Sequence, residues 1–347
     1  MSSAWHSGLP LAALLACLWL VPAPARAATT CTATAPGALA FGTITNGAAA
    51  PTNVMVSFKI QCSTVGLSLL ADASVRVCVG IGTGSTGTTL SPFRGMTNTF
   101  GDTMSFQLYT NAARTMPWGL LPGGTPPAQV VDLKYPVPVL GGNGEVTLTL
   151  YGQIPANQAL AFGSYTSSFS GSAVTLEYAY NEVLLGGSTT PATCTAGTTG
   201  HKTATDAFPF TVTANVLAQC SATVATDMDF GSRAGSIASA IDQTSTITTT
   251  CLKRTPFTVA LDNGLYAGGT SVRRMRHVTN AAYTIPYELY RDSARTLRWG
   301  TTQNVDTLAQ TGTGSAQPIT VYGRAPATVG AVAEGSYNDR VQVTITF

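Results

Sequence analysis

The sequence predicts an all-β protein built from two immunoglobulin-like sandwiches in tandem. The first observation is composition: Gly (35) and Pro (19) are abundant and Thr and Ser are found throughout the 347 residues, which favours short strands and turns over long helices. The second is a period-two hydrophobic pattern in several segments. The third is an internal repeat, which gives each half enough chain for its own core.

The first element is an export signal. An apolar run over residues 9–21 precedes two prolines and the small-x-small triplet 25–27, which is typical of a secretory signal peptide spanning residues 1–27. No later stretch approaches the eighteen or so apolar residues that span a bilayer. We therefore expect a mature chain that is exported and is either soluble or assembled at the cell surface.

The cysteines favour the same compartment. Six remain after the signal, an even number in an exported chain, and no two are closer than fifteen residues, which excludes a CxxC redox motif or a zinc knuckle. We expect three structural disulfides. The cysteines concerned are Cys31, Cys62, Cys78, Cys194, Cys220 and Cys251.

The chain contains the same pattern twice. Cys31 to Cys62 and Cys220 to Cys251 are both steps of 31 residues, and a Phe-Gly pair stands ten residues after each first Cys. Gapless matches follow between residues 108–119 and 289–300, 150–156 and 321–327, and 163–165 and 335–337. A period near 189 residues indicates two globular domains rather than a solenoid.

Within each half, segments alternate or are rich in β-branched residues. These predicted strands span residues 54–60, 145–151, 174–180, 245–250 and 340–347. About seven such strands per half are typical of an immunoglobulin-like sandwich, with one disulfide tying the first strands of each domain. Cys78 and Cys194 occur only in the first repeat, so we expect them to pair there.

The domain boundary falls within residues 185–215, a stretch rich in Gly and Thr, and we place the domains at 28–205 and 206–347. The segment 208–217 alternates as a strand. It could complete the first domain, begin the second, or do both, and the pattern alone does not decide between them.

The repeated Cys, Phe-Gly, Leu-Tyr, Trp-Gly, Tyr-Gly and Gly-Ser-Tyr motifs, with the terminal Val-x-Val-Thr-Ile, resemble the spore coat protein U domain family. This is the subunit fold of archaic chaperone–usher pili. Two such domains in one chain resemble the two-domain adhesin at the tip of a Csu-type pilus. The resemblance covers nearly all of the mature chain and is clearest over residues 216–347.

The carboxyl end predicts an incomplete second domain. Its last predicted strand ends the sequence at Phe347, so a pilin-like sandwich would lack its last strand and expose a groove and a sheet edge. The resemblance implies that a strand is donated first by a periplasmic chaperone and then, at the outer-membrane usher, by the adjacent pilin subunit. The predicted acceptor edge consists of Val341, Val343, Ile345 and Phe347.

The amino end predicts a terminal subunit. Cleavage after Ala27 leaves three residues before Cys31, too few to donate a strand to a neighbour. A subunit that accepts a strand but donates none belongs at the end of a pilus, which is where an adhesin acts.

The first domain is predicted to carry the binding loops. Residues 28–200 hold five Lys or Arg and six Asp or Glu, against twelve and ten in residues 201–347. Its long turn-bounded apolar inserts favour adhesion to apolar surfaces, abiotic or host, although each side chain could instead fold back into its own core. The candidate residues are Leu120, Leu121, Val137, Val139, Leu140, Phe93 and Met96.

Other conspicuous residues have structural interpretations. Trp118 and Trp299 stand at equivalent places in both repeats, which favours a core role. Residues 273–277 form a basic cluster typical of a solvated strand face. Asn98 and Asp102 are candidates for a sugar site.

Several function classes are disfavoured. A net charge of +2 argues against nucleic acid as a partner, and two His in the mature chain with no GxSxG, HExxH or P-loop motif argue against an enzyme, a metal site or a cofactor. The alternatives to an apolar adhesin are a lectin-like glycan-binding tip subunit and a secreted spore-coat or matrix protein.

Overall fold

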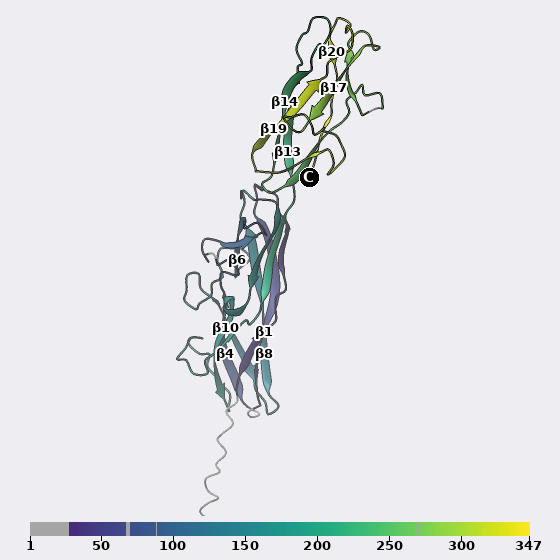
Figure 1. The fold of residues 1–347 in the computed structure, drawn as a ribbon. Helices are drawn as coiled ribbons and strands as arrows, with labels where there is room; N and C mark the ends of the chain where they lie inside the picture. The colour runs from purple at the N-terminus through teal and green to yellow at the C-terminus, as the bar shows by residue number, and fades with distance from the viewer. Residues whose placement is uncertain (1–27, 67–69, 88, 270) are drawn as a thin grey trace, which may run out of the picture.

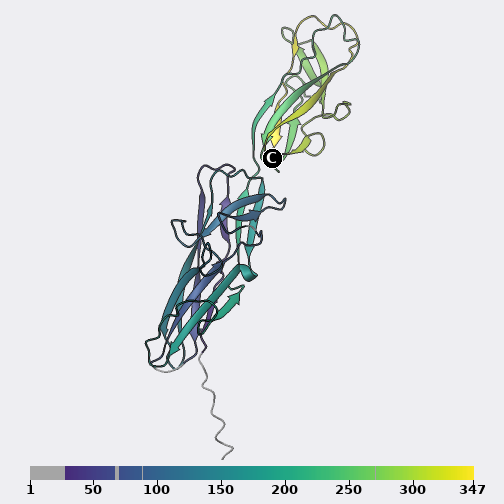
Figure 2. The same cartoon turned by 90° about the vertical axis from the view of Figure 1, so that its left-hand side faces the viewer.

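The computed structural model describes residues 28–66, 70–87, 89–269 and 271–347, which form two β-sandwiches joined end to end (Figure 1). A view turned by 90° shows the same two bodies with a narrow connection between them (Figure 2). The signal peptide expected at 1–27 lies outside the described residues. None of the helices in the described ranges has the length and apolar character needed to cross a membrane.

The first sandwich packs an eight-stranded sheet against a four-stranded sheet. The larger sheet has the spatial order β1 (Thr30–Ala33), β3 (Thr52–Thr64), β8 (Gly142–Ile154), β6 (Thr103–Tyr109), β5 (Arg94–Thr97), β9 (Gly163–Phe169), β12 (Phe210–Val216) and β2 (Leu39–Thr43). The smaller sheet has the order β11 (Lys202–Thr205), β10 (Val174–Val183), β4 (Asp72–Ile81) and β7 (Gln129–Pro136). A short 3-10 helix, η3 (Gly171–Ala173), carries the chain from β9 in one sheet to β10 in the other.

The second sandwich repeats this order with fewer strands. Its larger sheet has the order β13 (Cys220–Ala225), β14 (Ile241–Cys251), β19 (Ala316–Ala325), β17 (Thr284–Tyr290), β16 (Arg273–His277) and β20 (Tyr337–Asn338). Its smaller sheet has the order β18 (Leu308–Thr311), β15 (Pro256–Leu261) and β21 (Val343–Thr346). Among the described residues, this domain has no strand in the places that β12 and β2 occupy in the first.

Each sandwich encloses its own core, and the repeated tryptophans lie at equivalent places in the two cores. Trp118 and Trp299 are fully buried, and each donates its indole N–H to a strand carbonyl, of Val79 at 2.7 Å and of Val259 at 2.8 Å. The core role predicted for both is therefore confirmed.

A buried arginine is also repeated. Arg94 Nε donates to the carbonyl of Gly82, and Arg273 Nε donates to that of Asp262; each guanidinium also donates to the carbonyl of the buried tryptophan of its own domain. The prediction of a solvated basic face is wrong for Arg273, whose side chain is 0% exposed. Its guanidinium is buried because it is the donor that ties together the ends of several strands.

The segment 208–217 belongs to the first sandwich. β12 pairs antiparallel with β9 and parallel with β2, and the side chains of Phe210, Val212, Ala214 and Val216 are buried in the first core. The first sandwich therefore continues past the expected boundary at 205/206, as far as Val216. Residues 217–219 then lead to β13.

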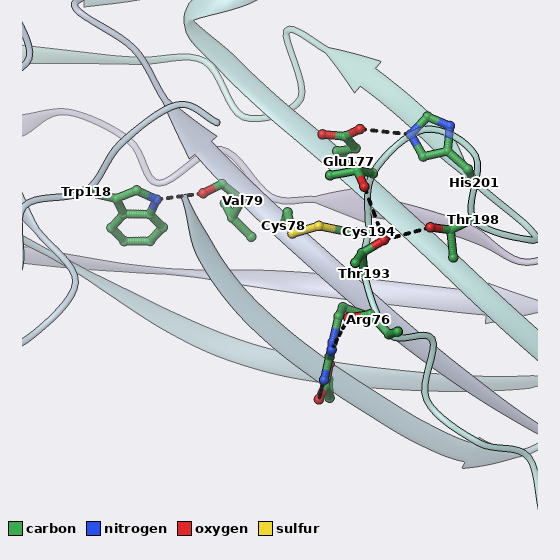
Figure 3. Close-up of a disulfide and its surroundings, with 12 residues drawn as sticks. Arg76, Cys78, Val79, Trp118, Glu177, Thr193, Cys194, Thr198 and His201 are labelled. Carbon is green, nitrogen blue, oxygen red and sulfur yellow. Dashed lines mark hydrogen bonds and ion pairs between the residues drawn. A yellow bond between two sulfur atoms is a disulfide. The ribbon is translucent and has the colours of Figure 1, made fainter. Parts of the chain in front are cut away.

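The disulfides join the expected cysteines. Cys31–Cys62 and Cys220–Cys251 each link the first two paired strands of their domain, β1 with β3 and β13 with β14. Cys78–Cys194 joins the outer face of β4 to the segment 184–201, which we call the strap (Figure 3).

The strap crosses the outer face of the smaller sheet. Arg76, on the same face of β4 as Cys78, donates from Nη1 to the Ala192 carbonyl, and His201 lies 2.9 Å from Glu177 of β10 (Figure 3). Because it returns from the end of β10 to β11 and β12, the strap brings the closing strand back to the first sandwich.

Candidate functional site

The second sandwich carries an open groove where β12 would lie. The repeated Gly-Ser-Tyr motif places β20 in the position of β9, and a shift of 189 residues places Met228 and Phe230 in the positions of Leu39 and Phe41 of β2. In the first domain, β12 lies between these two elements. In the second domain, no strand of the described residues lies between β20 and residues 228–230.

Two cavities run along this groove, of about 480 and 390 Å³. They share Met228, Phe230, Met275 and Tyr337, so they form one continuous depression. Its floor is made of core side chains of the second sandwich, among them Ile247, Leu289 and Val321. The groove therefore reaches the hydrophobic core along a strand that lacks a neighbour, which is a site for an added strand.

One polar contact joins two residues that line the groove, Tyr287 and Asp339. The Tyr287 hydroxyl donates to Asp339 Oδ2 at 2.7 Å, and the N–H of Leu265 donates to Oδ1 of the same carboxylate. Burial, and then the hydrogen bond to Asp339, raise the pKa of Tyr287. The phenol stays protonated, and this contact fixes the chain just after β20.

Of the four predicted edge residues, Val343 and Ile345 belong to β21 of the smaller sheet, and Val341 and Phe347 lie outside any strand. Val341 and Val343 line the groove, but Ile345 packs on the core from β21, and Phe347 is 55% exposed. The prediction of one edge strand over 340–347 is wrong, because the chain passes from the larger sheet to the smaller one between β20 and β21. The edge that borders the groove belongs to β20.

A second candidate site lies at the distal end of the first domain, the end away from the second domain (Figure 1). Three segments meet there, which we call the distal loops: residues 65–66 and 70–71 between β3 and β4, 137–141 after β7, and 183–187 at the end of β10. Their described apolar side chains are well exposed. The exposed fractions are Val65 69%, Leu70 67%, Val139 61%, Leu140 100%, Leu184 57% and Leu185 83%.

Close backbone approaches hold the distal loops together. A Cβ on Gly66 would overlap the Val139 carbonyl oxygen, and one on Gly186 would lie 3.3 Å from that of Leu70. Asp72, at the start of β4, accepts hydrogen bonds from the N–H groups of Gly187 and Ser188. The three loops therefore present one apolar surface on a rigid sheet end, a surface of the kind that mediates contacts.

The structure brings together only part of the predicted adhesive set. Val139 and Leu140 lie in the distal loops, and both are exposed. Leu120 and Leu121 lie elsewhere, because the N–H of Ile81, at the far end of β4, donates to Gly119. The ten residues of β4 span roughly 30 Å between these two places. Phe93, 36% exposed, precedes β5 and is also away from the distal end.

The exposure predicted for Met96 and Val137 is wrong. Both are 0% exposed: Met96 pairs with Met104 inside the first core, and Val137 continues the inward alternation of Leu133 and Tyr135. The missed residues are Val65, Leu70, Leu184 and Leu185. A signal for two of them was present, since Leu184-Leu185 breaks the alternation of its strand just before Gly186-Gly187.

The candidate sugar-site residues have structural contacts. Asn98 Oδ1 accepts hydrogen bonds from the N–H groups of Phe100 and Asp102, and Asp102 lies 2.6 Å from Lys253 of the second domain. These contacts place both residues in the joint between the domains.

Solved structures that match this chain include pilus tip adhesins. The CsuC–CsuE chaperone–tip adhesion subunit complex of Acinetobacter baumannii Csu pili matches with 16% identity, covering 92% of this chain and 100% of that chain, at a TM-score of 0.39. The CupB6 tip adhesin of Pseudomonas aeruginosa matches with 11% identity, covering 92% and 94% of the two chains, at a TM-score of 0.32.

The sequence itself also has a relative. Protein U of Myxococcus xanthus is 37% identical over 108 residues, which are 30% of this chain and 59% of that protein. The sequence model of the Spore Coat Protein U domain matches residues 18–171 and again residues 206–344. The chain therefore belongs to the Spore Coat Protein U domain family, with two copies of the domain.

Proposed function

We propose that the protein is the tip subunit, an adhesin, of a chaperone–usher pilus. The second domain accepts a strand from a partner, first a periplasmic chaperone and then, at the outer-membrane usher, the adjacent pilin subunit. The first domain attaches cells to abiotic or host surfaces. This function places the protein at the cell surface, at the end of the pilus.

The observation that carries the proposal is the open groove. β12 fills the matching space in the first domain, with four buried apolar side chains at alternate positions and ladders on both sides. An incoming strand of the same pattern would run antiparallel to β20 and parallel to the segment at Met228–Phe230. Phe210 stacks on Phe169 at 4.6 Å in the first domain, and Val341 stands in the place of Phe169 in the second. The groove therefore has room for a large apolar residue at that position.

The distal loops give the attachment surface. They lie at the end opposite the groove-bearing domain, so they would be the free end of an assembly that continues beyond that domain (Figure 1). None of the described residues of these loops is charged. Burying one leucine contributes roughly 1.5–3 kcal/mol, and many pili on one cell multiply the contact.

An added strand tests the groove. A Gly/Ser linker and a second copy of residues 208–217 are placed after Phe347 in the full chain. Insertion of the strand fills the apolar groove and pairs the edge of β20, so we expect the thermal midpoint of the second domain to rise by about 10 °C. The measurement is differential scanning calorimetry of the purified chain.

The control is the same extension with Asp at the added counterparts of Phe210 and Val212, which cannot be buried in an apolar groove without a large cost. Equal stability of the two extended chains and the unextended chain would show that the groove accepts no strand, and the pilus assignment would fail. A spore-coat or matrix protein is then the better assignment.

A further inference from the structure

The joint between the two domains has the form of a donated strand followed by its own domain. β12 completes the first sandwich, yet the second family match begins at residue 206, before β12. The amino-terminal segment of the second repeat therefore completes the first repeat. If the proposed function is right, the next subunit completes the second domain with a strand in the same way that the second repeat completes the first domain.

Contacts outside the strand also hold this joint. Lys253 and Arg254, in the turn between β14 and β15, both pair with Asp102, at 2.6 and 3.2 Å. The Arg254 guanidinium lies 5.3 Å from the centre of the Phe100 ring, and the N–H of Phe162 donates to the Lys253 carbonyl. The turn between β14 and β15 of the second domain therefore docks on the end of the first domain.

The far end of the second domain is built like the surface that receives this turn. Asn98 Nδ2 donates to the Phe162 carbonyl, next to Gly163, and His277 Nε2 lies 2.8 Å from the Glu334 carbonyl, next to Gly335. A Cβ on Gly163 would meet Asn98, and one on Gly335 would meet His277. His277 therefore takes the place of Asn98, and Glu334 takes that of Phe162.

The acidic group of this second surface is Glu334. Tyr283 directly precedes β17, as Asp102 directly precedes β6, so Tyr283 occupies the position of Asp102. The carboxylate of the second surface is therefore on the neighbouring loop, at Glu334. Glu334 and Tyr283 are both exposed, and within the described part of the chain Glu334 takes part in no ion pair. The carboxylate is available to a cation from outside.

We propose that His277, Tyr283 and Glu334 form a docking surface, the end face, for the subunit whose strand fills the groove. The proposal rests on the proposed function. The end face receives the partner's turn that corresponds to residues 252–255, and a Lys or Arg of that turn pairs with Glu334. A neighbour is thus held by two contacts, its donated strand and this turn.

The probe is the chain's own second domain. The full chain is extended after Phe347 by a Gly/Ser linker and a second copy of residues 206–347, so that the added strand enters the groove and the added body follows it. Cysteine replaces Glu334 in the original domain and Arg254 in the added copy. We expect a disulfide between the two on mild oxidation, read by mass spectrometry after proteolysis.

Val305→Cys in place of Glu334→Cys is the position control, because Val305 is 68% exposed but lies by the opposite end of β17, where Arg291 contacts its carbonyl. Charge provides a second measurement. Glu334→Lys in the extended chain should lower energy transfer between dyes on the original and the added domain, and Lys253→Glu with Arg254→Glu in the added copy should restore it.

The two proposals fail in different ways. An added strand that leaves the thermal midpoint of the original second domain unchanged contradicts the pilus function. A strand that raises the midpoint overturns the end face alone if the Glu334→Cys chain forms no more crosslink than the Val305→Cys control and the charge changes have no effect.

Discussion

Leu140 and Leu185 expose 100% and 83% of their surface on two different distal loops. Each directly precedes a glycine in a turn, and a polar residue would fit the position of either leucine equally well. Exposed leucines gathered from several loops are uncommon on a soluble surface unless they bind something. Burying one such leucine against an apolar material would contribute roughly 1.5–3 kcal/mol to binding.

Replacing both leucines by Ser tests this contact. We expect Leu140→Ser with Leu185→Ser to weaken attachment to polystyrene by about 3–6 kcal/mol per molecule, because two apolar contacts are lost. Stability should change by less than about 0.5 kcal/mol per site, since neither side chain packs on the core. Adhesion of beads coated with the full chain measures the effect.

Leu121→Ser is the matched control, because Leu121 is 62% exposed but lies away from the distal loops. Attachment that survives the double change but is inhibited by free sugars would instead identify a lectin. Attachment lost equally in the Leu121 variant would mean that general surface hydrophobicity, not the distal loops, is responsible.

The exposure of a side chain was predictable where turn residues flank it, and was not predictable where a strand continues beyond its recognised segment. Val139 and Leu140 stand between Pro138 and Gly141, and they are exposed. Val137 is predicted with them, yet the same period-two pattern that marks β7 carries it inward. The burial of Arg273 could not be predicted from charge, because it depends on carbonyls that only the folded chain brings together.

Among the elements, the strap is peculiar to the first domain. It covers the outer face of β4, where Ser74 bonds Ser188 and Cys78 bonds Cys194, while the other face of the strand lies in the core. A cross-link over 116 residues restricts the unfolded chain strongly, by about 5 kcal/mol in the chain-entropy account.

Removal of this disulfide should destabilise one domain only. In Cys78→Ala with Cys194→Ala we expect the unfolding transition of the first domain to lose up to about 5 kcal/mol, and that of the second to be unchanged. Urea titration followed by domain-resolved hydrogen exchange distinguishes the two. An unchanged first-domain transition would show that the polar contacts of the strap suffice to hold it.

The joint between the domains depends on a carboxylate. Hydrogen bonding to Lys253, and then to Arg254, holds the pKa of Asp102 below its ordinary value of 3.8. A carboxyl with a lowered pKa in the folded joint adds stability above its ordinary pKa and loses that contribution as the pH falls through the lowered value. We therefore expect a joint that is constant from neutral pH to about 4 and loosens at lower pH.

Small-angle scattering and interdomain energy transfer from pH 7 to 2 measure this loosening. Asp102→Ala should show it already at neutral pH. Asp132→Asn is the control, because Asp132 also has a lowered pKa, through Arg76, but both groups lie within the first domain. A joint that is equally rigid in Asp102→Ala would show that the strand connection alone sets the domain orientation.

Strand existence was predictable from period-two patterns, and the ends of strands were not. Residues 54–60 and 145–151 mark the centres of β3 and β8, which continue for several residues on both sides. Residues 340–347 alternate without interruption, but only residues 343–346 form a strand. This strand, β21, pairs with β15 of the smaller sheet, while β20 of the larger sheet ends at Asn338. A period of two identifies a strand but not its partner.

Across the whole molecule, the described residues form two versions of the same sandwich, the first closed and the second with an open groove. The repeat and the sandwich fold were predictable, because cysteine spacing and motif order fix which strands correspond. The role of β12 was not predictable, because the pattern of a strand between two repeats is compatible with either repeat. Its pairing with β9 and β2 depends on contacts between segments that are distant in the sequence.

This strand also sets how the molecule responds to tension along its length. A pull that separates the two domains reaches the first one through residues 217–219 and acts along the axis of β12, so the ladders with β9 and β2 are loaded in shear and their hydrogen bonds must yield together rather than one by one. The joint is therefore strongest in the direction of stretching, and Val212 and Val216 are the most deeply buried of the side chains that anchor it in the core.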